Sequence, residues 1–177
     1  EYSSQIDSGN MQISEAGQAI ENYEKLLNGY IAYSSQNYDL ALEILNEVNT
    51  KFLSENSLQI YNNVVSDIAA QRFNIYKSTA MNAFQRGNYP EAITYLNAAR
   101  AVNPEDYSAM AYLAHSYRLN NQPTEAIAVF QEIAGKYPNS QRAVTAESYI
   151  TRIRSGNMCP EIGVPQVSYE VAVGELE

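Results

Sequence analysis

The chain has 177 residues, of which 20 are acidic and 11 basic, so its formal net charge is −9. A single cysteine and a single histidine exclude an internal disulfide and a four-ligand Cys/His zinc site. The acidic balance is a poor match for nonspecific nucleic-acid binding, no apolar run is long enough to span a bilayer, and the length suffices for a core without metal support.

The charge is unevenly distributed along the chain. Residues 1–71 carry −8, residues 72–154 carry +3 and residues 155–177 carry −4. A locally basic middle therefore lies between two acidic flanks, and this asymmetry points to acidic partners for the middle segment.

The first elements in chain order are helical. Residues 1–10 are polar, and we expect them to be frayed or a linker. Apolar residues at helical spacing predict a helix over residues 14–34. The side chains expected to face inward on it are Ile20, Tyr23, Leu27, Tyr30 and Ile31.

The next stretch predicts one long helix. No glycine or proline occurs between Gly29 and Gly87, and apolar residues keep a helical rhythm from residue 57 to residue 86. At the standard rise this helix is about 45 Å long. The alternative is two helices broken near Arg72.

Two stretches then align without a gap at a shift of 34 residues. In each, a small residue is followed by a large one and then by a proline: Ala92, Leu96 and Pro104 match Ala126, Phe130 and Pro138. A weaker copy lies upstream, with Ala41, Leu45 and Val48. Turn and breaker residues predict helical hairpins with helices at residues 72–86, 90–102, 105–119, 123–134 and 140–154.

This period and pattern resemble the tetratricopeptide repeat over roughly residues 22–154. The family's tryptophan is replaced by Tyr76 and Met110, and its Gly-Tyr pair survives once, as Gly87 and Tyr89. The stretch 126–149 also resembles the variant found in bacterial envelope proteins. The resemblance implies an all-α solenoid of antiparallel helix pairs over residues 1–155, with a long central helix. Its repeats would be 73–106, 107–140 and a divergent 22–55, closed by a polar capping helix at 140–154.

The last stretch, residues 156–177, breaks the helical pattern. Glycines and prolines are followed by an alternation of apolar and polar residues over 167–173, which is typical of a strand. This acidic tail, or that of a neighbouring copy, is a candidate occupant of the basic inner face.

In such a stack the first helix of each pair lines a concave face. The aromatic, apolar and basic residues expected there suit an extended, acidic peptide through charge-assisted hydrogen bonds and stacking. They are Lys77, Met81, Phe84, Tyr112, His115, Arg118, Arg142, Tyr149 and Arg152. A solvated helix face with no ligand is the competing interpretation.

Three functions follow from this pattern. The preferred one is a non-enzymatic scaffold that binds a protein or peptide partner, with no cofactor and no metal. The second is an envelope or cell-wall factor that acts by oligomerising. The third is an enzyme subunit using His115, although no catalytic motif surrounds it and Cys159 lacks an activating neighbour in sequence.

The polar surface composition bears on location. Asparagine and glutamine together number 29, whereas lysine numbers only four. This balance favours an extracytoplasmic bacterial protein, with any membrane attachment supplied by a segment upstream of residue 1. A cytoplasmic location is the alternative.

Overall fold

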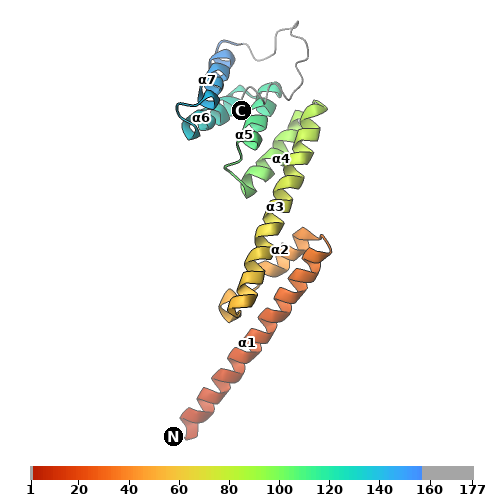
Figure 1. Cartoon of the computed structure of the whole chain (residues 1–177), viewed down its shortest axis with the longest axis vertical. Helices are drawn as coiled ribbons and strands as arrows, with labels where there is room; N and C mark the ends of the chain where they lie inside the picture. Colours follow the sequence, from red (N-terminus) through yellow and green to blue (C-terminus); the bar gives the residue numbers. More distant parts are fainter. Residues whose placement is uncertain (1, 157–177) are drawn as a thin grey trace. The chain divides into compact units, whose positions relative to one another are not determined.

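The structure is a computed structural model that describes residues 2–156, with side chains from Gly9 onward (Figure 1). Over these residues it contains helices and short connections, without strands. They group into two compact units: unit 1 comprises residues 1–71, and unit 2 begins at Arg72. The expected strand at 167–173 and the expected docking of the tail fall outside the described residues. The expectation of a single domain over 1–155 stays a prediction.

Unit 1 is built from a helical hairpin and the start of a third helix. Helix α1 spans Tyr2–Ser34, α2 spans Tyr38–Asn46, a 3-10 turn η1 spans Thr50–Phe52, and α3 begins at Glu55. Their packing buries one apolar cluster, whose largest members are Leu26, Leu45, Val64 and Ile68. Ala41, Leu45 and Val48 are all buried, so the weak upstream copy of the repeat is confirmed as a packed hairpin.

Close approach and two polar contacts hold this hairpin together. A Cβ on Gly29 would lie 2.7 Å from the Leu45 side chain, so α1 and α2 cross where only glycine fits. The buried Asn22 accepts a hydrogen bond from the Asn49 backbone, and the Tyr33 hydroxyl donates one to Asp67 at 2.7 Å. The first bond joins the loop after α2 to α1, and the second joins α3 to α1.

The structure corrects two expectations for α1. Residues 2–13, including the stretch expected to be frayed or a linker, belong to helix α1, and no proline interrupts them. The prediction that five apolar side chains of this helix face inward is wrong. They are 39–62% exposed: Ile20, Tyr23, Leu27, Tyr30 and Ile31. The buried face carries Asn22, Leu26, Gly29 and Ala32 instead, since small residues at the crossing decide which face can approach α2.

Helix α3 is continuous. It spans Glu55–Gln85 and runs through the boundary between the two units. The prediction of one long helix is therefore confirmed and the alternative break near Arg72 is excluded. Absence of glycine and proline is sufficient to explain this continuity.

Unit 2 stacks helices in chain order. After the second part of α3 come α4 at Tyr89–Val102, α5 at Tyr107–Leu119, α6 at Pro123–Lys136 and α7 at Gln141–Arg154. One apolar cluster runs through them all. Ala92 and Ala126 are fully buried beside Leu96 and Phe130, which are also inaccessible, so the small-on-large packing expected at each crossing is confirmed.

The hairpin turns share one backbone device. A residue with positive φ immediately precedes the N-cap of the second helix of each pair: Gln36 at 60°, Gly87 at 77° and Asn121 at 58°. The side chains of Asn37 and Asn88 then cap α2 and α4 by accepting backbone N–H groups. Glycine and asparagine adopt the left-handed conformation readily, which is why sequence signals located these turns.

Candidate functional site

The nine residues expected on the inner face come from three helices of unit 2. Helix α3 carries Lys77, Met81 and Phe84, α5 carries Tyr112, His115 and Arg118, and α7 carries Arg142, Tyr149 and Arg152. The structure divides them into a buried group, a paired cation and a partly exposed group.

Three of them lie in the core and offer no contact area. Phe84, Tyr112 and His115 are only 3–5% exposed, so the expectation that they present aromatic surface to a peptide is corrected. Phe84 packs edge-on against Tyr112 and Tyr89, with ring centroids 5.2 and 5.6 Å apart. The reason is that α5 is enclosed on several sides: all residues from 109 to 116 are buried.

Lys77 has its charge compensated within unit 2. Its ammonium lies 3.0 Å from an Asp106 carboxylate oxygen and 5.4 Å from the Phe73 ring centroid. Asp106 is also the N-cap of α5, where it accepts the Ala109 backbone N–H at 2.7 Å. The pair therefore joins α3 to the start of α5, and Lys77 has a structural partner.

His115 is a structural, neutral imidazole. Its ring meets Phe130 and Tyr149 edge-on, with centroids 5.3 and 4.7 Å away, and the Phe130 and Tyr149 rings stack at 5.1 Å. Burial, and secondarily the charge of Arg118, lower the pKa of His115 from 6.5 to about 3. Its Nε2 has no hydrogen-bond partner. An aromatic, desolvated cage of this kind holds the ring uncharged at physiological pH.

The remaining residues form a partly exposed surface. Arg142, Tyr149 and Arg152 recur at helical spacing along one face of α7, and the Arg118 guanidinium lies 5.6 Å from the Tyr149 ring centroid. We call these four residues the arginine strip. Arg142 also lies over Tyr107 and Tyr137, at 4.1 and 5.0 Å from their centroids. Met81, on α3, is half-buried against the core.

Four basic side chains outside α7 are ion-paired within unit 2, whereas none of the three arginines of α7, at 142, 152 and 154, forms an ion pair with a carboxylate of the described residues. Arg86, Arg100 and Lys136 each form an ion pair with a glutamate, as Lys77 does with Asp106. Within residues 2–156 no carboxylate forms an ion pair with Arg142 or Arg152. The strip thus combines two arginines that have no ion pair among the described residues, Arg142 and Arg152, with a half-exposed aromatic ring, Tyr149.

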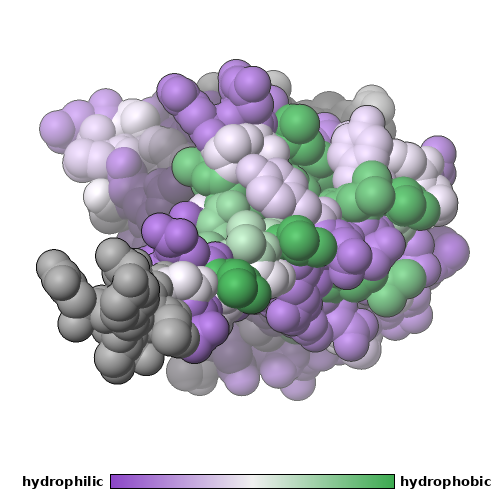
Figure 2. Space-filling view, turned by 90° about the horizontal axis from the view of Figure 1, so that it is seen from below, coloured by the Kyte–Doolittle hydropathy of each residue, from purple (hydrophilic) through white to green (hydrophobic). Residues whose placement is uncertain are grey.

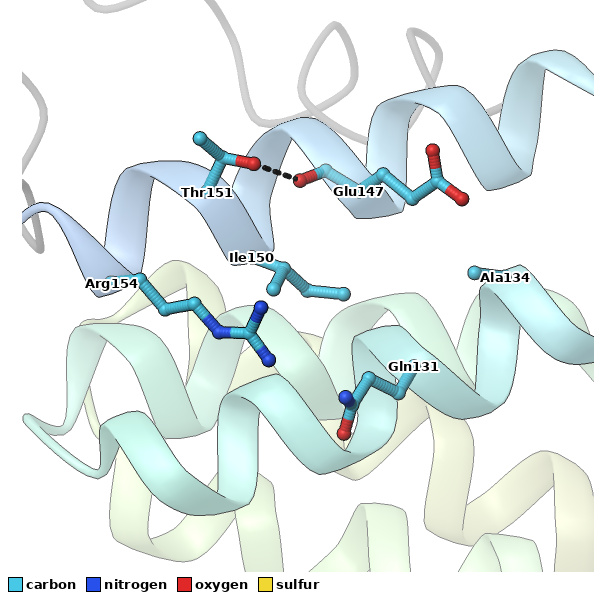
Figure 3. A pocket seen from close by; sticks show the side chains of 6 residues that line it. All are labelled: Gln131, Ala134, Glu147, Ile150, Thr151 and Arg154. Atoms are coloured by element: carbon cyan, nitrogen blue, oxygen red, sulfur yellow. Dashed lines mark hydrogen bonds between the residues drawn. The ribbon is translucent and has the colours of Figure 1, made fainter.

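A separate groove lies between α6 and α7, with a volume of about 410 Å³ (Figure 3). Its lining comes from both helices: Gln131, Ala134, Glu147, Ile150, Thr151 and Arg154. The Thr151 hydroxyl donates to the Glu147 backbone carbonyl at 3.0 Å. One repeat earlier, the counterparts of Glu147 and Ile150 are Leu113 and Ser116, which are inaccessible in the core.

The groove differs in character from the matching place one repeat earlier. Leu113 lies in the cluster that includes α6, whereas Glu147, 34 residues later, is exposed. A charged residue at that position leaves no apolar surface that requires a further helix. The helix expected at 140–154 is present as α7, and its role as a polar cap stays a prediction.

Two further features were sought in the described residues: helices able to span a bilayer and clusters of metal-ligating side chains. None of α1 to α7 combines the length and the apolar character needed to cross a bilayer. Between residues 2 and 156, no group of three or more histidine, cysteine, aspartate or glutamate side chains is placed to hold a metal ion.

Comparison with known proteins agrees with the helical pairs. The family model of the tetratricopeptide repeat matches residues 78–141, a segment that runs from the second half of α3 through α6 to the first residue of α7. No curated protein and no solved structure matches the chain. The hairpin geometry, the buried alanines at each crossing and the family match agree: residues 78–141 of this chain are similar to the tetratricopeptide repeat.

Proposed function

We propose that this protein is a scaffold that binds an acidic protein or peptide segment through the arginine strip. Tetratricopeptide repeats generally mediate protein–protein interactions and are typically non-enzymatic. The observation that carries the proposal is the pairing pattern on one face of α7: Lys77, Arg86, Arg100 and Lys136 have carboxylate partners, whereas Arg142 and Arg152, which share a helix face with Tyr149, have none among the described residues.

The chemistry of the strip suits a carboxylate ligand. A guanidinium group forms two parallel hydrogen bonds with one carboxylate, and such charge-assisted bonds are stronger than neutral ones. Arg142 is held over Tyr107 and Tyr137, so its position is fixed before binding. The Tyr149 ring, stacked on Phe130 and half-buried, is similarly held, and its exposed part is available to an apolar or aromatic ligand residue. Little conformational entropy is lost when such a surface binds.

Neighbouring arginines on α7 allow a matched test. Arg152 belongs to the strip, whereas Arg154 lines the groove between α6 and α7 (Figure 3). Both side chains are exposed and two residues apart, so their charge reversals change net charge equally. The probe is a fluorescein-labelled peptide of alternating glutamate and phenylalanine, and the readout is fluorescence anisotropy at several salt concentrations.

We expect Arg152→Glu to weaken peptide binding about tenfold and to reduce its salt dependence, because an exposed charge-assisted contact is lost. Arg154→Glu should leave the affinity within about twofold of that of the parent. Equal losses in the two variants would mean that the peptide responds only to net charge, and the strip would then not be the binding surface.

Location in the cell is a separate proposal. An extracytoplasmic, bacterial setting is supported by the scarcity of lysine and the abundance of asparagine and glutamine. In that setting an anchor upstream of residue 1 would place the repeats at a membrane surface. Fractionation of the native host with an antibody against unit 2 tests it, and recovery only in the cytoplasm would reject it.

A further inference from the structure

Helix α1 carries a second apolar face that unit 1 does not use. Its residues are separated alternately by three and four positions: Ile13, Ala16, Ile20, Tyr23, Leu27 and Tyr30. We call this set the α1 seam. Ile13 is 73% exposed, Ile20 62% and Leu27 59%. These large apolar side chains form a continuous row on the helix, whereas apolar residues at a protein surface are usually isolated. Apolar side chains lie at the surface viewed from the end where α1 begins (Figure 2).

The seam is distinct from the face that folds unit 1. At 100° per residue, the buried positions Asn22, Leu26 and Gly29 centre about 120° around the helix from the seam. Completing the core of unit 1 therefore leaves the seam uncovered. Residues 10–18 are exposed on every side, so this part of α1 receives no support from packing.

A helix in that condition is marginal in water. Gly17 lies in the middle of it and costs about 1 kcal/mol of helix stability relative to alanine. An apolar partner along the seam would supply the missing stabilisation. The three-four spacing extends over 18 residues, about 27 Å, and is the repeat at which two α-helices pack side by side.

A membrane surface fits the seam less well than a helix does. Among the side chains described on α1, Glu15, Glu21 and Glu24 oppose a single cation, Lys25, whose ammonium already contacts Glu21 at 2.8 Å. Interfacial helices that bind anionic lipids carry lysine and arginine on their polar face. The charge on α1 would instead repel such lipids.

We propose that the α1 seam of one chain packs against the same seam of a second copy in antiparallel orientation, an association that goes beyond the proposed peptide binding. Pairing about a point between residues 21 and 22 places Ala16 opposite Leu27 and Ile20 opposite Tyr23. Small side chains then face large ones, which fills the interface. A parallel pair would instead place Ala16 against itself and leave a gap.

Antiparallel pairing would also give packing contacts to the half of α1 that unit 1 leaves exposed. The exposed residues 10–18 of one copy lie along the half of its partner that is anchored in unit 1. Tyr23 can be buried without a loss of hydrogen bonding, because its hydroxyl already accepts the Ser54 backbone N–H at 2.8 Å. Helix macrodipoles oppose each other in this arrangement, which is favourable.

Charge and area are consistent with a symmetric pair. In this register Glu15 lies level with position 28 of the partner helix, Glu21 with position 22 and Glu24 with position 19, and none of these positions is acidic. Apolar side chains exposed to this extent offer on the order of 500 Å² per copy. A pair would then bury on the order of 1,000 Å², the lower limit of specific interfaces, so we expect a weak association that depends on protein concentration.

Sedimentation equilibrium of the full chain, at up to about 100 μM, tests the association. The parent chain should be dimeric, and Ile20→Glu/Leu27→Glu should be monomeric, with a dissociation constant raised more than tenfold and the helical circular dichroism of unit 2 retained. The control, Ile60→Glu/Val144→Glu, changes two apolar residues that are 47% and 58% exposed off the seam, and it should remain dimeric. A monomeric parent chain, or an equal loss in the control, overturns the proposal.

Orientation is tested by cysteine cross-linking in a Cys159→Ser background. A mixture of Ala16→Cys and Leu27→Cys chains should form a disulfide-linked heterodimer, while neither variant alone should cross-link with itself. Self-cross-linking of Ala16→Cys would reject the antiparallel register. Co-sedimentation of a monomeric chain with phosphatidylglycerol vesicles, abolished by Ile20→Glu/Leu27→Glu, would assign the seam to lipid and overturn the pairing.

Discussion

The neutral imidazole of His115 makes the stability of unit 2 depend on pH. Burial among Phe130 and Tyr149, and then the charge of Arg118, lower its pKa from 6.5 to about 3 in the folded protein. In the unfolded chain the histidine titrates near 6.5. Below that pH the unfolded state therefore binds a proton that the folded state does not, and stability falls as the pH drops toward 3.

The expected size follows from linkage. One pKa unit corresponds to about 1.4 kcal/mol, so lowering the pH from about 7.5 to about 5 should reduce the free energy of unfolding by about 2 kcal/mol through His115 alone. The full loss, reached near pH 3, is about 5 kcal/mol. This contribution is present in full above the unfolded pKa and disappears as the pH falls through the interval between the two values.

Urea denaturation followed by circular dichroism measures this effect. His115→Gln and His115→Phe remove the titrating group, and each should lose about 2 kcal/mol less than the parent chain between about pH 7.5 and about pH 5. Because carboxylates titrate equally in parent and variant, the difference between the two pH dependences isolates the histidine. Parallel pH profiles for the parent and both variants would refute the assignment of a buried, neutral imidazole.

Other predictions concern the backbone. Gly29→Ala places a Cβ 2.7 Å from Leu45 and should destabilise unit 1 by about 1–3 kcal/mol, whereas Gly17→Ala meets nothing within 4 Å and should raise helix stability by about 1 kcal/mol; thermal denaturation distinguishes the two. Gly87→Ala adds a Cβ that meets no neighbouring atom, but alanine would have to adopt φ 77°, which is unfavourable for a residue with a Cβ. The free energy of unfolding of unit 2, measured by urea denaturation, should therefore fall by about 1–2 kcal/mol. Ser140→Ala removes the cap of α7 and should cost about 1 kcal/mol, seen as faster amide exchange in its first turn.

The boundaries of the helices in unit 2 were predictable from local signals. Gly87 and Asn121 adopt positive φ at the hairpin turns, and Pro90 and Pro123 lie in the first turns of α4 and α6. Such residues act through their own backbone geometry, which does not depend on the rest of the fold. Observed helix starts and ends consequently lie within about two residues of those expected from the sequence.

The orientation of side chains was harder to predict, because it depends on neighbours. On α5, Tyr112 and His115 have the spacing of an inner face, yet both are buried since the helix is enclosed by other elements of unit 2. An unpartnered Nε2 and an aromatic cage arise only after the chain folds. The signal that was available is the run of alanines at 109, 111 and 114, which indicates a helix approached closely from several directions.

Helix α1 shows why hydrophobicity alone does not select the core face. It offers two candidate surfaces, and the larger side chains lie on the seam, which stays exposed. The face used in unit 1 contains Gly29 and a polar Asn22, and it succeeds because the missing Cβ lets α2 approach until Leu45 is fully buried. Glycine at 29 lies twelve residues before the buried Ala41, just as Ala80 precedes Ala92 and Ala114 precedes Ala126. Paired small residues at this separation therefore predict the crossing better than apolar periodicity does, and they leave the larger apolar face free for a partner.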